Sequence, residues 1–545
     1  MKLKRKRNRD IFTSTCSSII NGVISFIIFL LVLVFPLIYN NAYFDILVTK
    51  YRFYWVCVVA MLVLCFILSL IMMVIDIMEY NGRHAKALFS RLLPQKWKET
   101  FCISDISALV FWGILVISTI QSDYVYEAFW GNEGRFSGLF LMSLYISSYF
   151  LISQFWHVKS WLLGLFLFSG MVMCFIGITD YFQLDVLLLR SGKNMIDPSE
   201  STIFTSTVGN INTYTAYVAL IMGFSGAMFS TAKKSCHLIL YYICMVISFM
   251  AIILGCSDNA YLSLAALFVF APVFLFKCRL GIKRYLIMIA SFFSVVQLVD
   301  WINQKFVDTV IGLDSLFQVI VNFRLLLPIT VIMWMLVAGI YYYDKKTDKD
   351  ALKLDKKPVK IWLLFMAAAM LVIGFIFCDA NFGGHAERYG SIGYYLEFKD
   401  SWGTNRGYIW RKTVELYMDF KPMHKLFGYG LDTFGILAKY EIGLEMKEAT
   451  TQSFENVHNE YLQYLITIGA TGLIAYIVFI GSAIIRMYKN LESNPYIIGC
   501  CFAVICYVTQ AVVNINLPIA TPMMWLLLSI GMAGCNKKVI ANDTK

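Results

Sequence analysis

Residues 53–78 read FYWVCVVAMLVLCFILSLIMMVIDIM and contain one charged side chain, that of Asp76. A helix needs about 20 apolar residues to cross a bilayer core of about 30 Å, and this stretch exceeds that length. Similar apolar windows recur along the chain and predict fourteen candidate helices. They lie near residues 18–38, 53–78, 104–121, 137–155, 161–180, 211–230, 238–255, 260–276, 285–300, 325–343, 361–378, 461–485, 495–512 and 519–534. The seventh and eighth windows alternatively form one broken unit around Cys256–Asn259.

The composition agrees with these windows. Of 545 residues, 59% are hydrophobic and only 15% are charged, whereas a soluble domain has about 45–50% apolar and about 25% charged residues. Most of the 14 cysteines fall inside the apolar windows, where they serve as small packing residues. A soluble multi-domain enzyme, a secreted disulfide scaffold and a disordered chain are therefore excluded. We expect an all-α polytopic membrane protein with about 12–14 transmembrane helices.

The distribution of lysine and arginine predicts the orientation. Cytoplasmic loops carry the excess of these residues, and placing the N-terminus inside puts 30 of the 46 on that side. Nine of the others lie in the long loop 379–460, which this rule does not govern well. Both termini are therefore expected to be cytoplasmic. Because the basic residues are scattered over many loops, no binding of nucleic acid is expected.

The long outside loop divides the chain into three expected parts. Residues 1–378 form an N-terminal transmembrane bundle of about 11 helices, residues 379–460 an extracytoplasmic loop subdomain, and residues 461–545 the C-terminal helices with a short cytoplasmic tail. Irregular polar backbone is costly in lipid, and the inside loops are short. Any active site is therefore expected on the outside face.

His458 is the leading candidate for catalysis because it lies where the long loop becomes a helix. The positive end of the helix dipole is expected to lower its pKa and keep the imidazole neutral. Eleven residues separate it from Gly469, which at about 100° per residue is three turns plus roughly 20°. Gly469 and Gly472 would then form a groove below it for a helix or a lipid tail. The alternatives are a capping histidine and glycines that only permit close packing.

Two arginines are candidates for binding phosphate. Arg406 is expected to begin a helix with Thr404 or Asn405 as N-cap, on a face different from that of Arg411. Arg135 lies between glycines just outside the fourth window, where a bulky anion can approach closely. Arginine grips phosphate oxygens in pairs. The alternatives are a surface ion pair for Arg406 and membrane-interface snorkelling for Arg135.

Together these segments resemble the O-antigen ligase and Wzy-type polymerase superfamily of bacterial membrane glycosyltransferases. The strongest match is His458-Asn459, then nine residues, then Gly469-Ala470-Thr471-Gly472. The motifs occur in the family's order from about residue 110 to 535. The other matching segments are Gly134-Arg135-x-x-Gly138, Gly209-Asn210-x-Asn212, Arg406-x-x-x-Trp410, and Pro422 followed by Gly428-x-Gly430.

The resemblance implies a GT-C-like fold and transfer of a glycan from undecaprenyl pyrophosphate to an acceptor hydroxyl. The acceptor would be a glycan, a lipid or a protein, at the outer face of the bacterial cytoplasmic membrane. The hypothesis is that His458 takes the acceptor proton while Arg406 and Arg135 hold the pyrophosphate, with inversion at the anomeric carbon. Neither a cofactor nor a metal is expected. Possible supporting residues are Arg411, Arg324, Arg388, Asn459 and Asn210.

One position departs from the family pattern. Many relatives carry Ser-Arg where this chain has Ser257-Asp258-Asn259, so one phosphate-facing arginine is missing there. Arg324, Arg388 or Arg135 would have to substitute for it.

Three other functions stay open. A polymerase of the same superfamily differs only in its acceptor. A flippase for lipid-linked sugars is less favoured, because windows such as 238–255 contain no charged residue and the two halves show no repeat. A scaffold without chemistry leaves the spacing between His458 and Gly469 unexplained.

Overall fold

The computed structural model describes residues 2–91, 95, 97–132, 134–190, 201–313, 315–347, 354 and 356–536. Within this part of the chain, nine helices are long and apolar enough to cross a membrane. Four shorter apolar helices accompany them. The prediction of an all-α polytopic membrane protein is confirmed.

The helices of the N-terminal half follow the expected windows. They are α1 (Lys2–Phe29) with η1 (Leu30–Val34), α2 (Ile46–Tyr80), α3 (Arg83–Arg91), α4 (Trp97–Thr100), α5 (Ile103–Ile120), α6 (Val125–Trp130), α7 (Leu139–Phe155), α8 (Ser160–Tyr181), α9 (Ile211–Thr231), α10 (Ser235–Leu254) and α11 (Asn259–Leu275). The seventh and eighth windows are two helices, α10 and α11, because the chain turns between them with Cys256 at a φ of +48°.

The remaining helices complete the bundle and build the segment between α15 and α21. The bundle helices are α12 (Arg279–Lys305), α13 (Ser315–Val321), α14 (Leu326–Thr347), α15 (Lys357–Asn381), α21 (Glu460–Lys489), α22 (Ile497–Gln510) with η5 (Ala511–Val513), and α23 (Thr521–Cys535). Between α15 and α21 lie η4 (Ala386–Ile392), α16 (Gly393–Leu396), α17 (Trp402–Asp419), α18 (Pro422–Phe427), α19 (Phe434–Glu441) and α20 (Gly443–Thr450). One short hairpin, with η3 (Ser201–Ile203) before β1 (Phe204–Thr205) and β2 (Gly209–Asn210), precedes α9.

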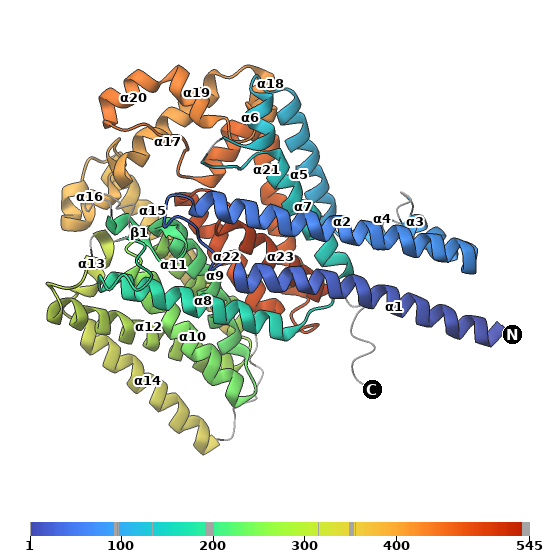
Figure 1. The fold of residues 1–545 in the computed structure, drawn as a ribbon. Helices are drawn as coiled ribbons and strands as arrows, with labels where there is room; N and C mark the ends of the chain where they lie inside the picture. Colours follow the sequence, from blue (N-terminus) through green and yellow to red (C-terminus); the bar gives the residue numbers. More distant parts are fainter. Residues whose placement is uncertain are drawn as a thin grey trace.

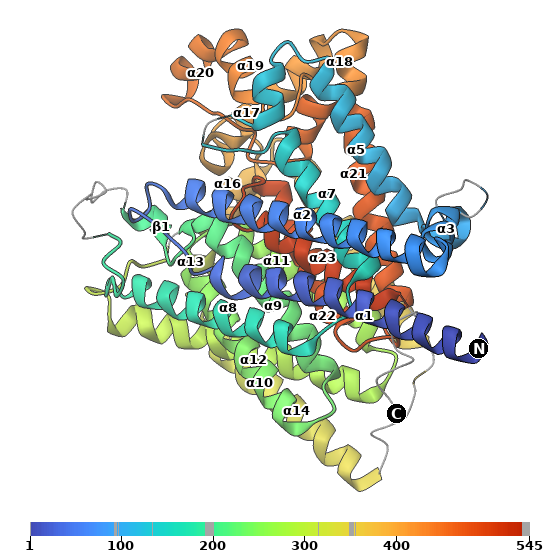
Figure 2. The same cartoon turned by 45° about the vertical axis from the view of Figure 1, so that its right-hand side comes forward.

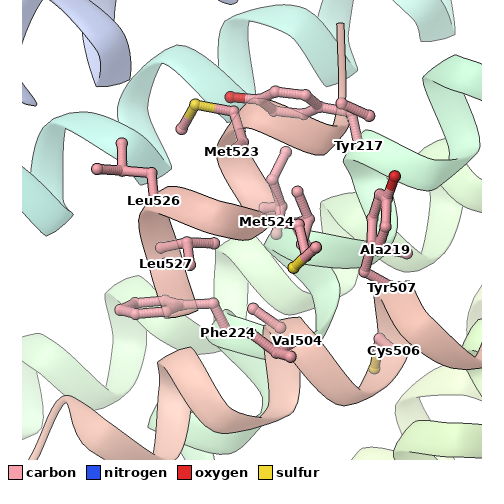
Figure 3. Packing of buried hydrophobic residues seen from close by; sticks show 14 of the residues in the cluster. Tyr217, Ala219, Phe224, Val504, Cys506, Tyr507, Met523, Met524, Leu526 and Leu527 are labelled. Atoms are coloured by element: carbon pink, nitrogen blue, oxygen red, sulfur yellow. The ribbon is translucent and has the colours of Figure 1, made fainter. Parts of the chain in front are cut away.

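Helix α9 lies at the centre of the bundle. Every residue from 213 to 230 is buried, and its Tyr217 and Phe224 pack with Val504 and Tyr507 of α22 and with Met524 of α23 (Figure 3). Protein rather than lipid therefore surrounds this helix.

The segment between α15 and α21 has its own hydrophobic core. Tyr408, Ile409, Phe434, Leu437 and Val457 belong to a buried cluster separate from that of the bundle. Figures 1 and 2 show α17, α19 and α20 grouped in the upper part of the molecule, which the upper ends of α5 and α21 also reach. The same views place the start of α1 and helix α3 on the side opposite β1. This cluster holds the segment as a compact unit against the end of α21.

Candidate active site

His458 lies just before the first turn of α21 in a left-handed backbone conformation, with a φ of +53°. Its backbone N–H donates to Oδ1 of Asn456 at 3.0 Å, and its ring meets the edge of the Phe454 ring at a centroid distance of 5.9 Å. On the preceding residue, the carbonyl of Val457 accepts from Trp410 Nε1 at 3.0 Å. The histidine is thus fixed between α17 and α21.

Asn459 is the N-cap of α21. Its Oδ1 accepts from the backbone N–H groups of Tyr461 at 3.0 Å and Leu462 at 3.1 Å. Gln463 completes the cap, because its Oε1 accepts from the N–H of Val457 at 3.0 Å. Asn459 therefore caps the start of α21, and this cap sets the position of the adjacent His458.

Burial, together with the positive charges of Arg406 and Arg135, lowers the pKa of His458 to about 3. The three residues that the sequence singled out for chemistry therefore act on one another in the fold. The shift has the expected direction, toward a neutral imidazole, but its main cause differs from the expectation. Burial and two arginines, rather than the helix dipole, disfavour the imidazolium.

Arg406 begins the regular part of α17. The residues before it, Gly403, Thr404 and Asn405, have φ values of +58°, +56° and +67°. An N-cap normally has an extended backbone, so the expected capping by Thr404 or Asn405 is wrong. Burial lowers the pKa of Arg406, and the carboxylate of Asp258 opposes that shift.

Asp258 is the residue that stands where the resemblance to the family implies an arginine. It is the exposed residue just before α11, and its charge acts on Arg406 across the site. The position therefore faces the candidate site. Its charge has the opposite sign to that of the family residue.

Arg135 is carried by a loop that closes on itself between Gly131 and Gly138, of which the structure describes residues 131, 132 and 134–138. Gly131 and Gly134 have φ values of +88° and +86°, and a Cβ on Gly138 would lie 2.3 Å from the backbone nitrogen of Gly131. The Arg135 side chain is 24% exposed, and its Nη2 lies 3.6 Å from Oε2 of Glu455. Only glycine fits this closure, which presents Arg135 toward the segment before His458.

Asp432 holds the Arg135 loop from the other side. Its Oδ2 accepts from the backbone N–H groups of Asn132 at 2.8 Å and Ser137 at 3.1 Å. Burial raises the pKa of Asp432 to about 7, while these two N–H groups and Arg135 oppose the rise. The ring of Phe136 also stacks on Tyr51 of α2 at a centroid distance of 4.5 Å.

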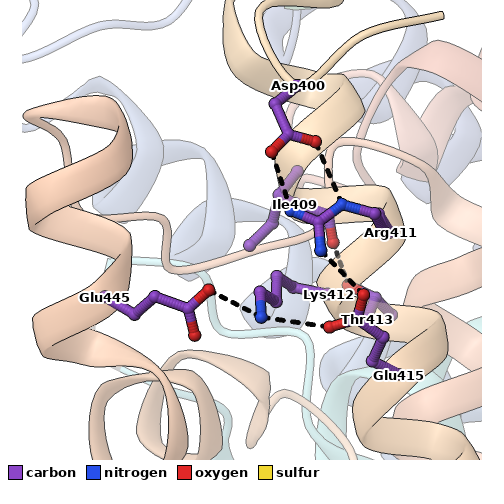
Figure 4. A network of polar contacts seen from close by, with 7 residues as sticks. All are labelled: Asp400, Ile409, Arg411, Lys412, Thr413, Glu415 and Glu445. Carbon is purple, nitrogen blue, oxygen red and sulfur yellow. Dashed lines mark hydrogen bonds and ion pairs between the residues drawn. The ribbon is translucent and has the colours of Figure 1, made fainter.

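The other candidate arginines lie in different surroundings. Arg411 binds both carboxylate oxygens of Asp400, at 3.0 and 2.7 Å, and Oε1 of Glu415 at 2.7 Å (Figure 4). Arg388 lies 3.7 Å from Oδ2 of Asp379 and is 63% exposed. Arg324 is exposed between α13 and α14. Only Arg406 and Arg135 are among the groups that shift the pKa of His458.

Asn210 also lies at a helix start. Its Oδ1 accepts from the N–H of Asn212 at 2.8 Å, which makes it the N-cap of α9. The carbonyl of Asn212 accepts from Asn259 at 2.8 Å and from Asn514 at 3.0 Å. This region therefore joins α9, α11 and the end of α22 beneath the site.

Gly469 breaks α21, with φ +72° and ψ 179°. The break exposes carbonyls of the preceding turn, which accept from another segment. The N–H groups of Tyr429 and Gly430 donate to Ile466 at 3.2 Å and to Thr467 at 2.8 Å. The expected continuous helical face from His458 to Gly469 is therefore wrong, because His458 precedes the helix and Gly469 interrupts it.

The space beside Gly469 is already filled. A Cβ there would lie 2.2 Å from the carbonyl oxygen of Leu426, and a Cβ on Gly472 would meet the side chain of Ile468 at 2.6 Å. The end of α18 thus occupies the groove expected for a helix or a lipid tail. A separate apolar groove of about 560 Å³ lies between α5 and α21, and Thr471 and Ile474 line it.

Sequence reasoning missed Asp432 and Glu455. Asp432 follows the recognised Gly428-x-Gly430 motif by two residues, so an acid in this glycine-rich turn was a signal that went unused. Glu455 precedes His458 by three residues in the loop after α20, where the sequence gives no sign of its contact with Arg135.

The fold and the site together define a multi-pass membrane protein with a histidine and two arginines gathered at one end of the helix bundle. Residues 319–477 match the family model described as O-antigen ligase. No curated protein matches the chain. The family match confirms the resemblance to the O-antigen ligase and Wzy-type superfamily. The protein therefore has a function of the O-antigen ligase or polymerase type, which implies lipid-linked glycan substrates in a membrane.

Proposed function

We propose that this protein transfers a whole glycan from undecaprenyl pyrophosphate to an acceptor hydroxyl at the outer face of a bacterial cytoplasmic membrane. The observation that carries the proposal is the convergence of His458, Arg406 and Arg135, which come from three separate segments. A base beside two cations suits a reaction in which a hydroxyl loses a proton and a pyrophosphate leaves.

His458 takes the proton in this mechanism. The acceptor oxygen attacks the anomeric carbon, the bond from that carbon to the pyrophosphate breaks, and the acceptor proton moves to the imidazole. Attack from the side opposite the leaving group inverts the anomeric centre. The charges of Arg406 and Arg135 stabilise the pyrophosphate as it leaves, so neither a metal nor a cofactor is required.

The same two arginines make His458 a poor base in the empty site. Its pKa is about 3 there because of burial and their charges. A bound pyrophosphate would neutralise the arginines and raise that pKa toward the operating range. Deprotonation of the acceptor would then require the donor to be present, which limits unproductive reaction.

The apolar groove between α5 and α21 is the proposed place for the polyprenyl chain. It is lined by Ile106, Val110 and Ile114 of α5 and by Ile474 and Val478 of α21. It adjoins Thr471, within the turns of α21 that lead up to His458. A lipid tail there would carry its pyrophosphate toward the outside end of the helix, with both protein termini in the cytoplasm.

The proposal is tested with purified protein in liposomes that contain lipid-linked glycan and acceptor extracted from the cells that make the protein. His458→Ala should lose transfer by about 10²–10⁴-fold, while His385→Ala, in the same outside segment but paired with Asp379 at 2.8 Å, should keep it. Full activity of His458→Ala would refute the catalytic role.

The arginines are tested as a matched pair on one helix. Arg406→Gln should raise the KM for the lipid-linked donor at least about tenfold, because it removes a charged partner of the pyrophosphate. Arg411→Gln removes a largely exposed ion pair and should have little effect. Equal effects of the two changes would contradict the assignment.

A ladder of repeat lengths in the product would identify a polymerase, and a single transfer would identify a ligase.

A further inference from the structure

A small cavity lies at the start of α21, where Asn456 and Glu460, on either side of His458 in the chain, line it. Its volume is about 30 Å³, and it is bounded by the Arg135 loop and by the first turns of α21. Glu460, Gln463, Tyr464 and Thr467 of α21 line it. Their spacing places them on one face of the helix. The cavity therefore adjoins the candidate site on the side of the helix start.

Among the residues that the structure describes, four side chains that line the cavity each have a buried polar atom without a hydrogen-bond partner. Within the described part of the chain, Arg135 Nε, Asn456 Nδ2, Glu460 Oε2 and Asn516 Oδ1 are buried without a hydrogen-bond partner. Each such atom costs about 1–3 kcal/mol when it stays unpaired, and native proteins contain few of them. Four of them around one cavity indicate that a polar group belongs inside it.

The partnered atoms of the same side chains hold them in place. Oε1 of Glu460 accepts from the hydroxyl of Tyr476 at 3.0 Å, and the hydroxyl of Tyr464 also acts on this carboxyl. Nδ2 of Asn516 donates to the Tyr464 hydroxyl at 3.0 Å. Oδ1 of Asn456 accepts from the N–H of His458, so Asn456 both lines the cavity and holds the backbone of the histidine. These hydrogen bonds therefore fix the positions of the unpaired atoms.

The chemistry of the unpaired atoms favours a neutral hydroxyl as the group that binds in the cavity. Arg135 and Asn456 offer N–H donors, while Glu460 and Asn516 offer oxygen acceptors. A hydroxyl group both donates and accepts, so it satisfies both kinds at once. An anion would meet the carboxyl of Glu460, and a cation would meet Arg135. A volume of about 30 Å³ is that of one small group, which excludes a whole sugar ring.

We propose that this cavity is an acceptor subsite, which takes a hydroxyl or hydroxymethyl group of a carbohydrate next to the hydroxyl that His458 deprotonates. The inference rests on the proposed glycan transfer and adds the class of acceptor. The reacting end of the acceptor is then a sugar rather than a protein side chain, because a Ser, Thr or Tyr side chain offers no second hydroxyl to fill the cavity.

Two near-isosteric variants test the subsite. Glu460→Gln replaces the unpaired oxygen acceptor with a donor, and Asn516→Leu removes the acceptor without changing the shape much. The probe is the envelope glycan of the producing cells, freed from lipid by mild acid and added as acceptor to liposomes with lipid-linked donor. Both variants should raise the KM for this glycan about tenfold or more, with a smaller change in kcat, because a sugar hydroxyl loses its partner.

Asp105→Asn is the matched control. Asp105 is as buried as Glu460, at 1% exposure, and likewise accepts from a tyrosine hydroxyl, that of Tyr149 at 2.9 Å. It lies in the first turn of α5 and does not line the cavity. Its replacement should leave the KM for the acceptor glycan unchanged.

Binding of farnesyl pyrophosphate distinguishes a failure of the proposed function from a failure of the proposed subsite. Both cavity variants should bind this sugar-free donor headgroup as the wild type does. If the wild type neither binds it nor transfers glycan, the proposed function fails. If the wild type transfers glycan and both variants keep its acceptor KM, the cavity holds only water and the subsite is refuted. Loss of farnesyl pyrophosphate binding in both variants also refutes it, since the cavity would then serve the donor.

Discussion

Replacing Gly469 with alanine tests the break in α21 directly. The backbone there has φ +72° and ψ 179°, a region that is essentially restricted to glycine and costs other residues about 1–3 kcal/mol. The added Cβ would also lie 2.2 Å from the carbonyl oxygen of Leu426. This atom belongs to the backbone and cannot rotate away, so overpacking adds about 1–3 kcal/mol. We expect a loss of about 2–6 kcal/mol in the free energy of unfolding.

Gly481→Ala is the matched control in the same helix. Gly481 lies in the regular part of α21, and a Cβ there would meet nothing within 4 Å. Alanine is favoured over glycine in a helix interior by about 0.5–1 kcal/mol. The control should therefore be as stable as the wild type or slightly more stable.

The assay is unfolding in mixed micelles by titration with sodium dodecyl sulfate, followed by tryptophan fluorescence. Equal stability of the Gly469→Ala and Gly481→Ala proteins would show that α21 runs straight through residue 469, and the reasoning would fail. Glycan transfer should also fall in Gly469→Ala. The break lets Tyr429 and Gly430 bond to α21, and this segment carries Asp432, which holds the Arg135 loop.

Three further changes probe the charges of the site. Asp258→Asn removes a negative charge facing Arg406, so the KM for the lipid-linked donor should fall by up to about fivefold, the effect of an exposed charge pair; a rise in that KM would contradict the placement of Asp258. Burial raises the pKa of Asp432 to about 7, so the folded protein holds this proton more tightly than the unfolded chain does, and the resulting stability is lost as the pH rises through 7. Asp432→Asn should therefore weaken the decline in unfolding free energy between pH 5 and 8, and an unchanged decline would assign it to another group. Treatment with EDTA should leave transfer intact, since Arg406 and Arg135 are proposed to neutralise the leaving group; activity that is lost and then restored by Mg²⁺ would show otherwise.

Much of the fold could be predicted because hydrophobic length is a strong constraint in a membrane. A chain in lipid must satisfy its backbone polar groups internally, so the apolar windows coincide with helices, as in 53–78 and α2. The window at 211–230 became α9, which contacts protein on all sides. Hydropathy gives the existence of such a helix but not its central place, since burial in protein and burial in lipid favour similar residues.

The arrangement of the site depends on contacts that local sequence does not encode. Helical periodicity placed Arg411 on a face different from that of Arg406, and Arg411 lies in a separate ion network. Periodicity failed at Gly469, because the approach of Leu426 from a distant segment decides the backbone there. The meeting of Arg135 with His458, more than 300 residues apart in the chain, follows from the packing of the bundle. The catalytic and phosphate-binding roles of these residues stay predictions.

The central position of α9 affects the order in which the protein can be assembled. Helix α9 ends at Thr231, and its neighbour α22 begins about 270 residues later, at Ile497. At about 5–20 residues per second, a ribosome needs roughly 15–50 s to cover this interval. During that time α22 is not yet available to cover its face of α9. A chain truncated after α21 would keep the matched family segment and still leave its central helix without its neighbour.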